Sequence, residues 1–155
     1  MSEKMRLIVV SGLSGSGKSV ALHILEDLDF YCIDNLPASL LKSLLNKVSN
    51  SDEQPTKRIA VGVDARNRLS DLESLSKFIN ELRQSNVRVD VLFLQTSTNI
   101  LLKRYSETRR KHPLANHKTE LRAAIANERK LLDPVMNYAD LVIDSERVSR
   151  KHALI

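Results

Sequence analysis

Eight consecutive residues near the amino terminus carry the side chains and the spacing of a phosphate-binding loop. The run 12–19 reads GLSGSGKS and satisfies the pattern G-x-x-x-x-G-K-[ST] in full. Its glycines let the backbone curl, so that successive N–H groups converge on phosphate oxygens. Lys18 would reach the β- and γ-phosphates, and the Ser19 hydroxyl would bind Mg²⁺. The predicted phosphate-binding residues are Gly12, Leu13, Ser14, Gly15, Ser16, Gly17, Lys18 and Ser19.

A second signal is an acidic residue that directly follows an apolar run. Asp64 comes after the run IAVGV, where P-loop proteins place the carboxylate that holds Mg²⁺. Asp34 and Asp144 also end apolar runs and are rivals for this role. Asp144 belongs to the last run, which we expect at the sheet edge, and Asp34 leads into a turn with Pro37. We therefore predict that Ser19 and Asp64 bind the metal.

Positive charge is concentrated in residues 103–130, which we call the basic segment. It holds nine Lys or Arg residues against three Glu residues, whereas the whole chain carries a net charge of +5. Such a patch favours a polyanionic partner, either the phosphates of a nucleotide or a nucleic acid. Arg109 and Arg110 lie just before Pro113, which ends any helix there. Together with Arg104 they are candidates for stabilising the charge of a phosphoryl group in transfer.

These residues need a scaffold, and apolar runs alternate with helical periodicities along the chain. An S-x-x-E capping box at Ser70 and Glu73 marks the start of one helix. Strands rich in Val, Ile and Leu without polar alternation are typical of a parallel sheet covered on both faces. The sequence thus predicts an α/β fold of the P-loop NTPase, kinase-like type, with three layers and a five-stranded, mainly parallel sheet. The expected strands are 7–10, 31–34, 59–63, 89–94 and 141–143, and the expected helices are 20–28, 39–48, 70–82, 99–106 and one with an apolar stripe at Leu121, Ile125 and Leu132.

Bulk composition limits the class of protein. The 155 residues suit one domain over 1–155, and 42% hydrophobic with 28% charged residues is ordinary for a globular protein. No apolar run approaches membrane-spanning length, and the lone Cys32 forms no internal disulfide, so we expect a cytoplasmic protein without a membrane partner. Residues 148–155 read as a helix without a stop signal, which predicts a fragment of a longer protein.

Several segments beyond the phosphate-binding loop resemble one known family, the P-loop nucleotide-binding proteins of the RapZ type. The similarity spans almost the whole chain and several of its segments are distinctive. It rests on VSGLSGSGKSVAL (10–22), FYCIDNLP (30–37), DARN (64–67), RYSETRRKHPL (104–114) and ADLVID (139–144).

The resemblance implies that the loop binds ATP and that both ATP and GTP are hydrolysed. It assigns GTP binding to Asp64, Ala65, Arg66 and Asn67. It also implies that the chain is an N-terminal domain of a regulatory adapter. Contacts with small RNA or a protein partner would then be made mainly by a C-terminal domain that is absent here.

Two other functions stay open at this stage. A basic loop between two helices resembles the lid of small P-loop kinases, which indicates a kinase for a small acceptor or a nucleotide. The basic segment, Lys103–Lys130, also allows an RNA-binding module. Assembly into a homo-oligomer stays open as well.

Overall fold

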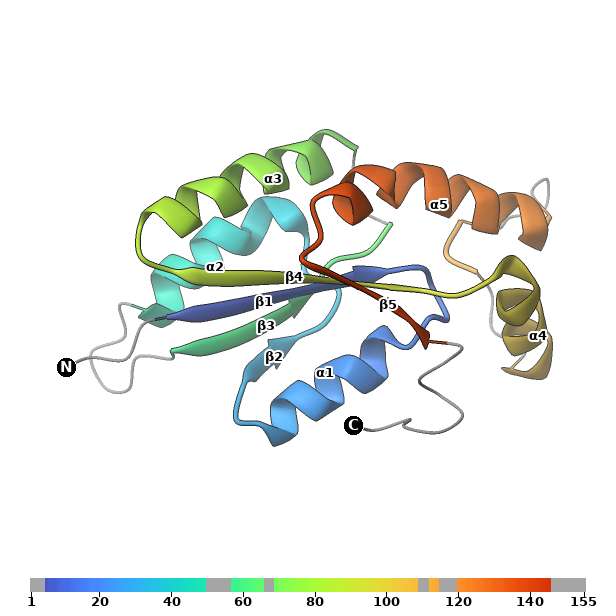
Figure 1. The fold of residues 1–155 in the computed structure, drawn as a ribbon, viewed down its shortest axis with the longest axis horizontal. Coiled ribbons are helices and arrows are strands. Elements are labelled where there is room, and N and C mark those ends of the chain that lie inside the picture. The colour runs from blue at the N-terminus through green and yellow to red at the C-terminus, as the bar shows by residue number, and fades with distance from the viewer. Residues whose placement is uncertain (1–4, 50–56, 66–68, 109–111, 115–119, 146–155) are drawn as a thin grey trace.

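The computed structural model describes residues 5–49, 57–65, 69–108, 112–114 and 120–145 (Figure 1). Its strands are β1 (Arg6–Gly12), β2 (Tyr31–Ile33), β3 (Arg58–Gly62), β4 (Arg88–Gln95) and β5 (Leu141–Asp144). Its helices are α1 (Lys18–Asp27), α2 (Leu41–Ser49), α3 (Leu69–Gln84), α4 (Thr98–Thr108) and α5 (Leu121–Asn137), and a 3₁₀ turn, η1 (Ala38–Leu40), leads into α2. The expected strands and helices are confirmed, with ends that shift by a few residues.

The strands form one parallel sheet in the order β2-β3-β1-β4-β5. Strand β1 lies at the centre, where Val10 pairs with Gly62 of β3 on one side and with Leu92 of β4 on the other. Parallel neighbours require crossover connections, which the helices supply. The predicted sheet is therefore confirmed, and each strand pairing in the described part is parallel.

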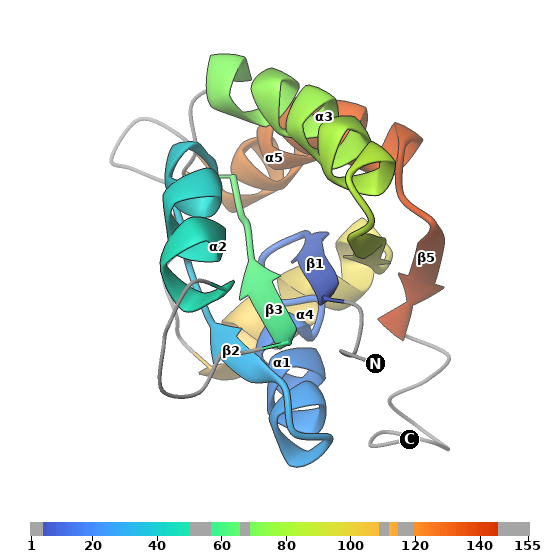
Figure 2. The same cartoon turned by 90° about the vertical axis from the view of Figure 1, so that its left-hand side faces the viewer.

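Helices cover both faces of the sheet and give the expected three layers. Helices α2, α3 and α5 lie on one face and α1 lies on the other (Figures 1 and 2). Alternate residues of β1 explain how both faces become buried: Leu7 and Val9 join the core under α2, α3 and α5, whereas Ile8 and Val10 join the core under α1. Every residue of β1 from Leu7 to Gly12 is buried, as the continuous apolar run predicts.

One detail of the helix predictions is wrong. Helix α3 begins at Leu69, so Ser70 and Glu73 lie inside its first turns. The Ser70 carbonyl accepts a hydrogen bond from Ser74 Oγ at 2.9 Å, which is an interaction of the helix interior. The capping box therefore marks the helix but places its start slightly too late. The expected helix at 148–155 lies outside the described residues.

The carboxyl ends of all five strands meet at one edge of the sheet, because the strands are parallel. The loop after β1, Asp34 after β2, Asp64 after β3 and Thr96 after β4 all follow from this edge. A small apolar cluster of Leu13, Leu101 and Ile125 joins the loop to α4 and α5 there. Among the helices in the described ranges, none combines the length and the apolar character needed to cross a membrane.

Candidate functional site

The loop between β1 and α1, residues 12–19, is held closed by its own hydrogen bonds and by β4. We call it the phosphate loop. Leu13 N donates to Leu94 O of β4 at 3.1 Å, and Ser16 N donates back to Leu13 O at 3.0 Å. Gly12 has a φ of +144°, and a Cβ there would lie 2.2 Å from Leu94 O. Glycine is therefore required where the loop leaves the sheet.

The amino end of α1 has no side-chain cap. Its N-cap residue is Gly17, which adopts a left-handed conformation and offers no acceptor, and the first turn contains no acidic residue. The first amides of a helix have no partner inside the helix, and the helix dipole makes this end positive. An anion that binds at the phosphate loop would supply the missing acceptors.

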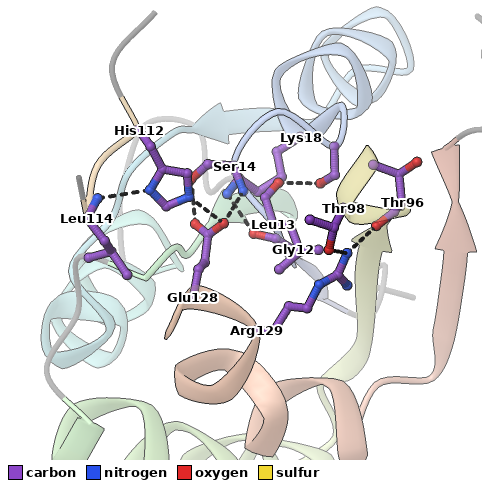
Figure 3. A network of polar contacts seen from close by, with 11 residues as sticks. Gly12, Leu13, Ser14, Lys18, Thr96, Thr98, His112, Leu114, Glu128 and Arg129 are labelled. Carbon is purple, nitrogen blue, oxygen red and sulfur yellow. Dashed lines mark hydrogen bonds and ion pairs between the residues drawn. The ribbon is translucent and has the colours of Figure 1, made fainter. Parts of the chain in front are cut away.

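Two cationic side chains lie against the phosphate loop. Lys18 Nζ donates to Gly12 O at 2.8 Å, so the lysine folds back over the loop (Figure 3). Arg104 of α4 donates to Gly15 O at 2.7 Å and to Ser145 Oγ at 3.3 Å. A helix far along the chain therefore brings positive charge to the loop, as the concentration of charge in the basic segment predicts.

A buried carboxylate binds the loop from the opposite side. Glu128 of α5 accepts hydrogen bonds from Ser14 N at 2.8 Å, from Ser14 Oγ at 2.5 Å and from His112 Nε2 at 3.1 Å (Figure 3). The side chain of Glu128 is fully buried, and that of His112 is almost fully buried. Burial raises the pKa of the Glu128 carboxyl, but the hydrogen bonds from His112 and Ser14 outweigh it and leave the pKa below its usual value.

Arg129, which follows Glu128 in α5, holds the turn after β4 in place. Arg129 donates to Thr96 O at 2.6 Å and to Thr98 Oγ1 at 3.3 Å (Figure 3). These bonds hold the beginning of α4 against α5. Helix α5 therefore contacts the site through two adjacent residues, one acidic and one basic.

The predicted metal-binding acid lies at the same edge but is buried. Asp64 is 6% exposed, and the preceding Val63 N donates to Val10 O at 3.0 Å, so this part of the chain runs beside β1. Ala65 is buried next to it. The remaining predicted GTP-binding residues, Arg66 and Asn67, lie outside the described residues.

The rival acid, Asp34, shares a surface hollow with Ser19, the serine of the phosphate loop that is predicted to bind the metal. This hollow of about 140 Å³ lies between α1 and β2 and is lined by Ser19, Leu22, His23, Glu26, Cys32 and Asp34. A side chain at Gly62 would place its Cβ 2.7 Å from Asp34 Oδ1, so the carboxylate lies close against β3. Asp64, next to β1, and Asp34, in the hollow with Ser19, thus both remain candidates on geometric grounds. Asp144 ends β5 at the opposite edge of the sheet from β2.

Two more of the predicted site residues lie outside the described part, and two residues of the site were not predicted. Arg109 and Arg110 fall in the undescribed residues 109–111. Glu128 and His112 were not singled out from the sequence. A signal for Glu128 exists, because it lies on the same helical face as Ile125 and Leu132, where an acidic residue interrupts an apolar stripe.

Comparisons with known proteins agree with this geometry. A family model described as the RapZ-like N-terminal domain matches residues 5–154. A "nucleotide-binding protein" of Halorhodospira halophila is 52% identical over 145 residues, which cover 94% of this chain and 50% of that protein. A protein of the same description from Ectopseudomonas mendocina is 48% identical and is covered to 51%. The chain thus spans about half the length of these relatives.

Two of the solved structures with a similar fold are kinases by their titles. A shikimate kinase of Bacteroides thetaiotaomicron superposes with a TM-score of 0.60 at 16% identity, covering 98% of this chain and 93% of that one. A gluconokinase of Sinorhizobium meliloti gives 0.54 at 18% identity, covering 99% and 91%. At such identities the likeness concerns the fold, which is the kinase-like P-loop type. With 150 of its residues matched by the family model, the chain belongs to the RapZ-like family, in the part that forms the N-terminal domain.

Proposed function

We propose that this domain binds the triphosphate of ATP or GTP together with Mg²⁺ at the phosphate loop and hydrolyses it. The observation that carries the proposal is the uncapped, glycine-preceded amino end of α1, with Lys18 and Arg104 beside it. The relatives described as nucleotide-binding proteins support it.

In this proposal each residue has a definite task. Backbone amides of Gly15 and of residues 17–19 bind phosphate oxygens, and Lys18 exchanges its contact with Gly12 O for the terminal phosphates. Ser19 and Asp64 hold Mg²⁺, which when bound neutralises charge on the phosphate oxygens. A hydroxyl and one carboxylate suit an ion that keeps several of its waters. Arg109 and Arg110 stabilise the phosphoryl group in transfer, and the segment Asp64–Asn67 contributes to GTP binding.

The test compares Lys18→Ala with Lys47→Ala, which removes the same charge from the exposed side of α2 on the other face of the sheet. Titration calorimetry with ATP–Mg²⁺ and GTP–Mg²⁺ should detect binding in the unaltered chain and in the Lys47 variant. The Lys18 variant should lose at least about tenfold in affinity, the value of a charge-assisted hydrogen bond. Equal binding by both variants would overturn the proposal.

The choice of metal-binding acid has its own measurement. Asp64→Asn should raise the Mg²⁺ concentration that gives half-maximal phosphate release, whereas Asp34→Asn should leave it unchanged. The reverse pattern would assign the metal to Asp34, which shares the hollow with Ser19.

A kinase for a small acceptor is the second candidate function. It is favoured by the hollow beside Ser19, which offers Asp34, Glu26 and His23 to a hydroxylated molecule. Labelled ATP separates the two candidates, because transfer of the label to an acceptor supports a kinase and release as phosphate supports hydrolysis.

Binding of RNA is less well supported by the arrangement of the basic segment. Arg104 and Arg129 donate hydrogen bonds to groups inside the protein, which occupies donors that would otherwise be available to the phosphates of a nucleic acid. Contacts with small RNA, a protein partner or a second copy remain predictions, and we assign them mainly to the C-terminal domain that the longer relatives suggest.

A further inference from the structure

The fully buried Glu128 has no task in the proposed hydrolysis, yet it makes the densest set of polar contacts at the phosphate loop. Its Oε1 accepts from Ser14 N at 2.8 Å and from His112 Nε2 at 3.1 Å, and its Oε2 accepts from Ser14 Oγ. These contacts join three separate parts of the chain: the phosphate loop, α5 and the segment 112–114 (Figure 3).

The hydrogen bonds of His112 determine its protonation. Leu114 N donates to Nδ1 at 3.0 Å, so Nδ1 must be the acceptor and carry no proton. The proton then sits on Nε2, which donates to Glu128. The imidazole is therefore a neutral bridge between the backbone of Leu114 and the carboxylate, with both ring nitrogens in use.

Stability alone does not explain an acidic side chain at this position. Glu128 continues the buried face of α5 that holds Ile125 and Leu132. Placing a carboxylate in such a site is costly, and an apolar residue of similar volume is often equally stable or more stable there. What the carboxylate provides and an apolar side chain does not is two hydrogen bonds to one residue of the loop.

We propose that Glu128 is a positioning residue that holds Ser14 and couples the phosphate loop to the segment 112–114 through His112. The proposal rests on the proposed function, because its consequence is for binding of a nucleoside triphosphate. With Ser14 fixed by its amide and its hydroxyl, the adjoining amides of the loop are ordered before the ligand arrives. A preordered site loses less entropy on binding.

The coupling is reciprocal. A triphosphate bound beside Ser14 changes the strength of the hydrogen bonds between Ser14 and Glu128, and thereby of the bond between Glu128 and His112. By linkage, whatever strengthens or weakens the bond between His112 and Glu128 must in turn change nucleotide affinity. Substitutions at His112, whose Nε2 is bonded to Glu128 and not to the loop itself, are therefore the sharpest probes.

The first test uses Glu128→Leu, which removes both acceptor oxygens, with Val135→Ala as the matched control. Val135 lies on the same helix, is equally buried, and belongs to the core away from the loop. Titration calorimetry with ATP–Mg²⁺ and GTP–Mg²⁺ and urea unfolding are measured for both variants. We expect Glu128→Leu to bind about tenfold more weakly. Val135→Ala should unfold at lower urea with unchanged affinity.

The direction of the change in nucleotide affinity distinguishes lost positioning from lost charge. Removing a negative charge near a polyanion would by itself tighten binding. Weaker binding by Glu128→Leu therefore reports lost positioning and not lost charge. Unchanged or tighter binding would overturn the proposal.

The second test separates the two bonds of His112. His112→Gln can present a donor at the place of Nε2 and keep the bond to Glu128, whereas His112→Asn can replace only Nδ1, the acceptor for Leu114 N. We expect the Gln variant to bind nucleotide close to the unaltered chain and the Asn variant to bind about tenfold more weakly. Equal affinity of the two variants would overturn the coupling.

A spectroscopic measurement reads the coupling directly. The ring nitrogen signals of His112, assigned by their loss in the Gln variant, should change when nucleotide is added to the unaltered chain. They should stay constant in Glu128→Leu at saturating nucleotide, and a change of equal size there would contradict the proposal. If the unaltered chain binds neither nucleotide, the proposed function fails and this inference with it. Wild-type affinity in Glu128→Leu overturns this inference alone.

Discussion

Replacement of Gly12 by alanine should cost far more stability than replacement of Gly17, although both glycines have positive φ. In Gly12→Ala the new Cβ would lie 2.2 Å from Leu94 O, 2.8 Å from Leu94 N and 3.0 Å from Leu94 C. All three atoms are backbone of β4, a strand paired on both sides, so they cannot move aside as a side chain can. In Gly17→Ala no atom lies within 4 Å of the new Cβ.

The expected loss of stability in Gly12→Ala is the sum of three effects. Backbone strain at positive φ costs about 1–2 kcal/mol in either variant. At Gly12 the overlap with β4 adds about 1–3 kcal/mol. Displacing Leu94 O also weakens its hydrogen bond from Leu13 N, which is worth about 1 kcal/mol. We therefore expect a loss of about 3–6 kcal/mol for Gly12→Ala and about 1–2 kcal/mol for Gly17→Ala.

Urea unfolding followed by circular dichroism measures this difference. A domain with a free energy of unfolding of about 5–15 kcal/mol has room for the smaller loss, whereas the larger one leaves little stability. The midpoint for Gly12→Ala should be well below that for Gly17→Ala. Equal midpoints would show that the close approach of the phosphate loop to β4 places no constraint on residue 12.

Three further predictions concern ionisable groups. Burial raises the pKa of Tyr138 to about 12, and its hydroxyl has no hydrogen-bond partner among the described residues. Because the folded state holds this proton more tightly, the free energy of unfolding should fall as the pH rises from 10 towards 12. Tyr138→Phe should abolish that part of the loss. It should also raise the free energy of unfolding at neutral pH by about 1 kcal/mol, as urea unfolding would measure. Burial and the nearby Glu26 raise the pKa of the Cys32 thiol, so its alkylation by iodoacetamide should be slow and should accelerate in Glu26→Gln; an unchanged rate would contradict the contribution of Glu26. The lowered pKa of Glu128 contributes stability that is present above its ordinary value of 4.5 and is lost as the pH falls through the folded value, so acid unfolding should be shallower in Glu128→Gln.

Much of the fold could be predicted from local patterns in the sequence. The apolar run 7–10 predicts a strand buried on both faces, and β1 is such a strand. The stripe of Leu72, Leu75 and Ile79 predicts the buried face of α3, and all three are buried. The strand order β2-β3-β1-β4-β5 could not be predicted in this way. The periodicity of a strand indicates which of its faces is buried, but not which strand lies next to it.

The site could be predicted only where it is contiguous in the sequence. The phosphate loop is one run of eight residues, so its type and spacing are visible directly. The contact between Ser14 and Glu128 joins residues that are 114 positions apart, and no local pattern records it. A carboxylate within an apolar stripe indicates a buried partner, but naming Ser14 and His112 as the partners requires the packing of α5 over the loop.

The distribution of glycine explains how a flexible loop becomes an ordered site. The chain contains four glycines, and three of them, Gly12, Gly15 and Gly17, lie in the phosphate loop. The fourth, Gly62, lies where Asp34 approaches β3. Each glycine adds freedom to the unfolded chain, which must be removed on folding.

The structure removes that freedom from outside the loop. Leu94 of β4, Arg104 of α4 and Glu128 of α5 each bind a different part of its backbone. The backbone is thus free of side-chain obstruction where phosphate must approach and is held by three elements where it need not move. Loosening the contact with Arg104 or with Glu128 should therefore weaken ligand binding more than it weakens the fold, because the cores on the two faces of the sheet remain intact.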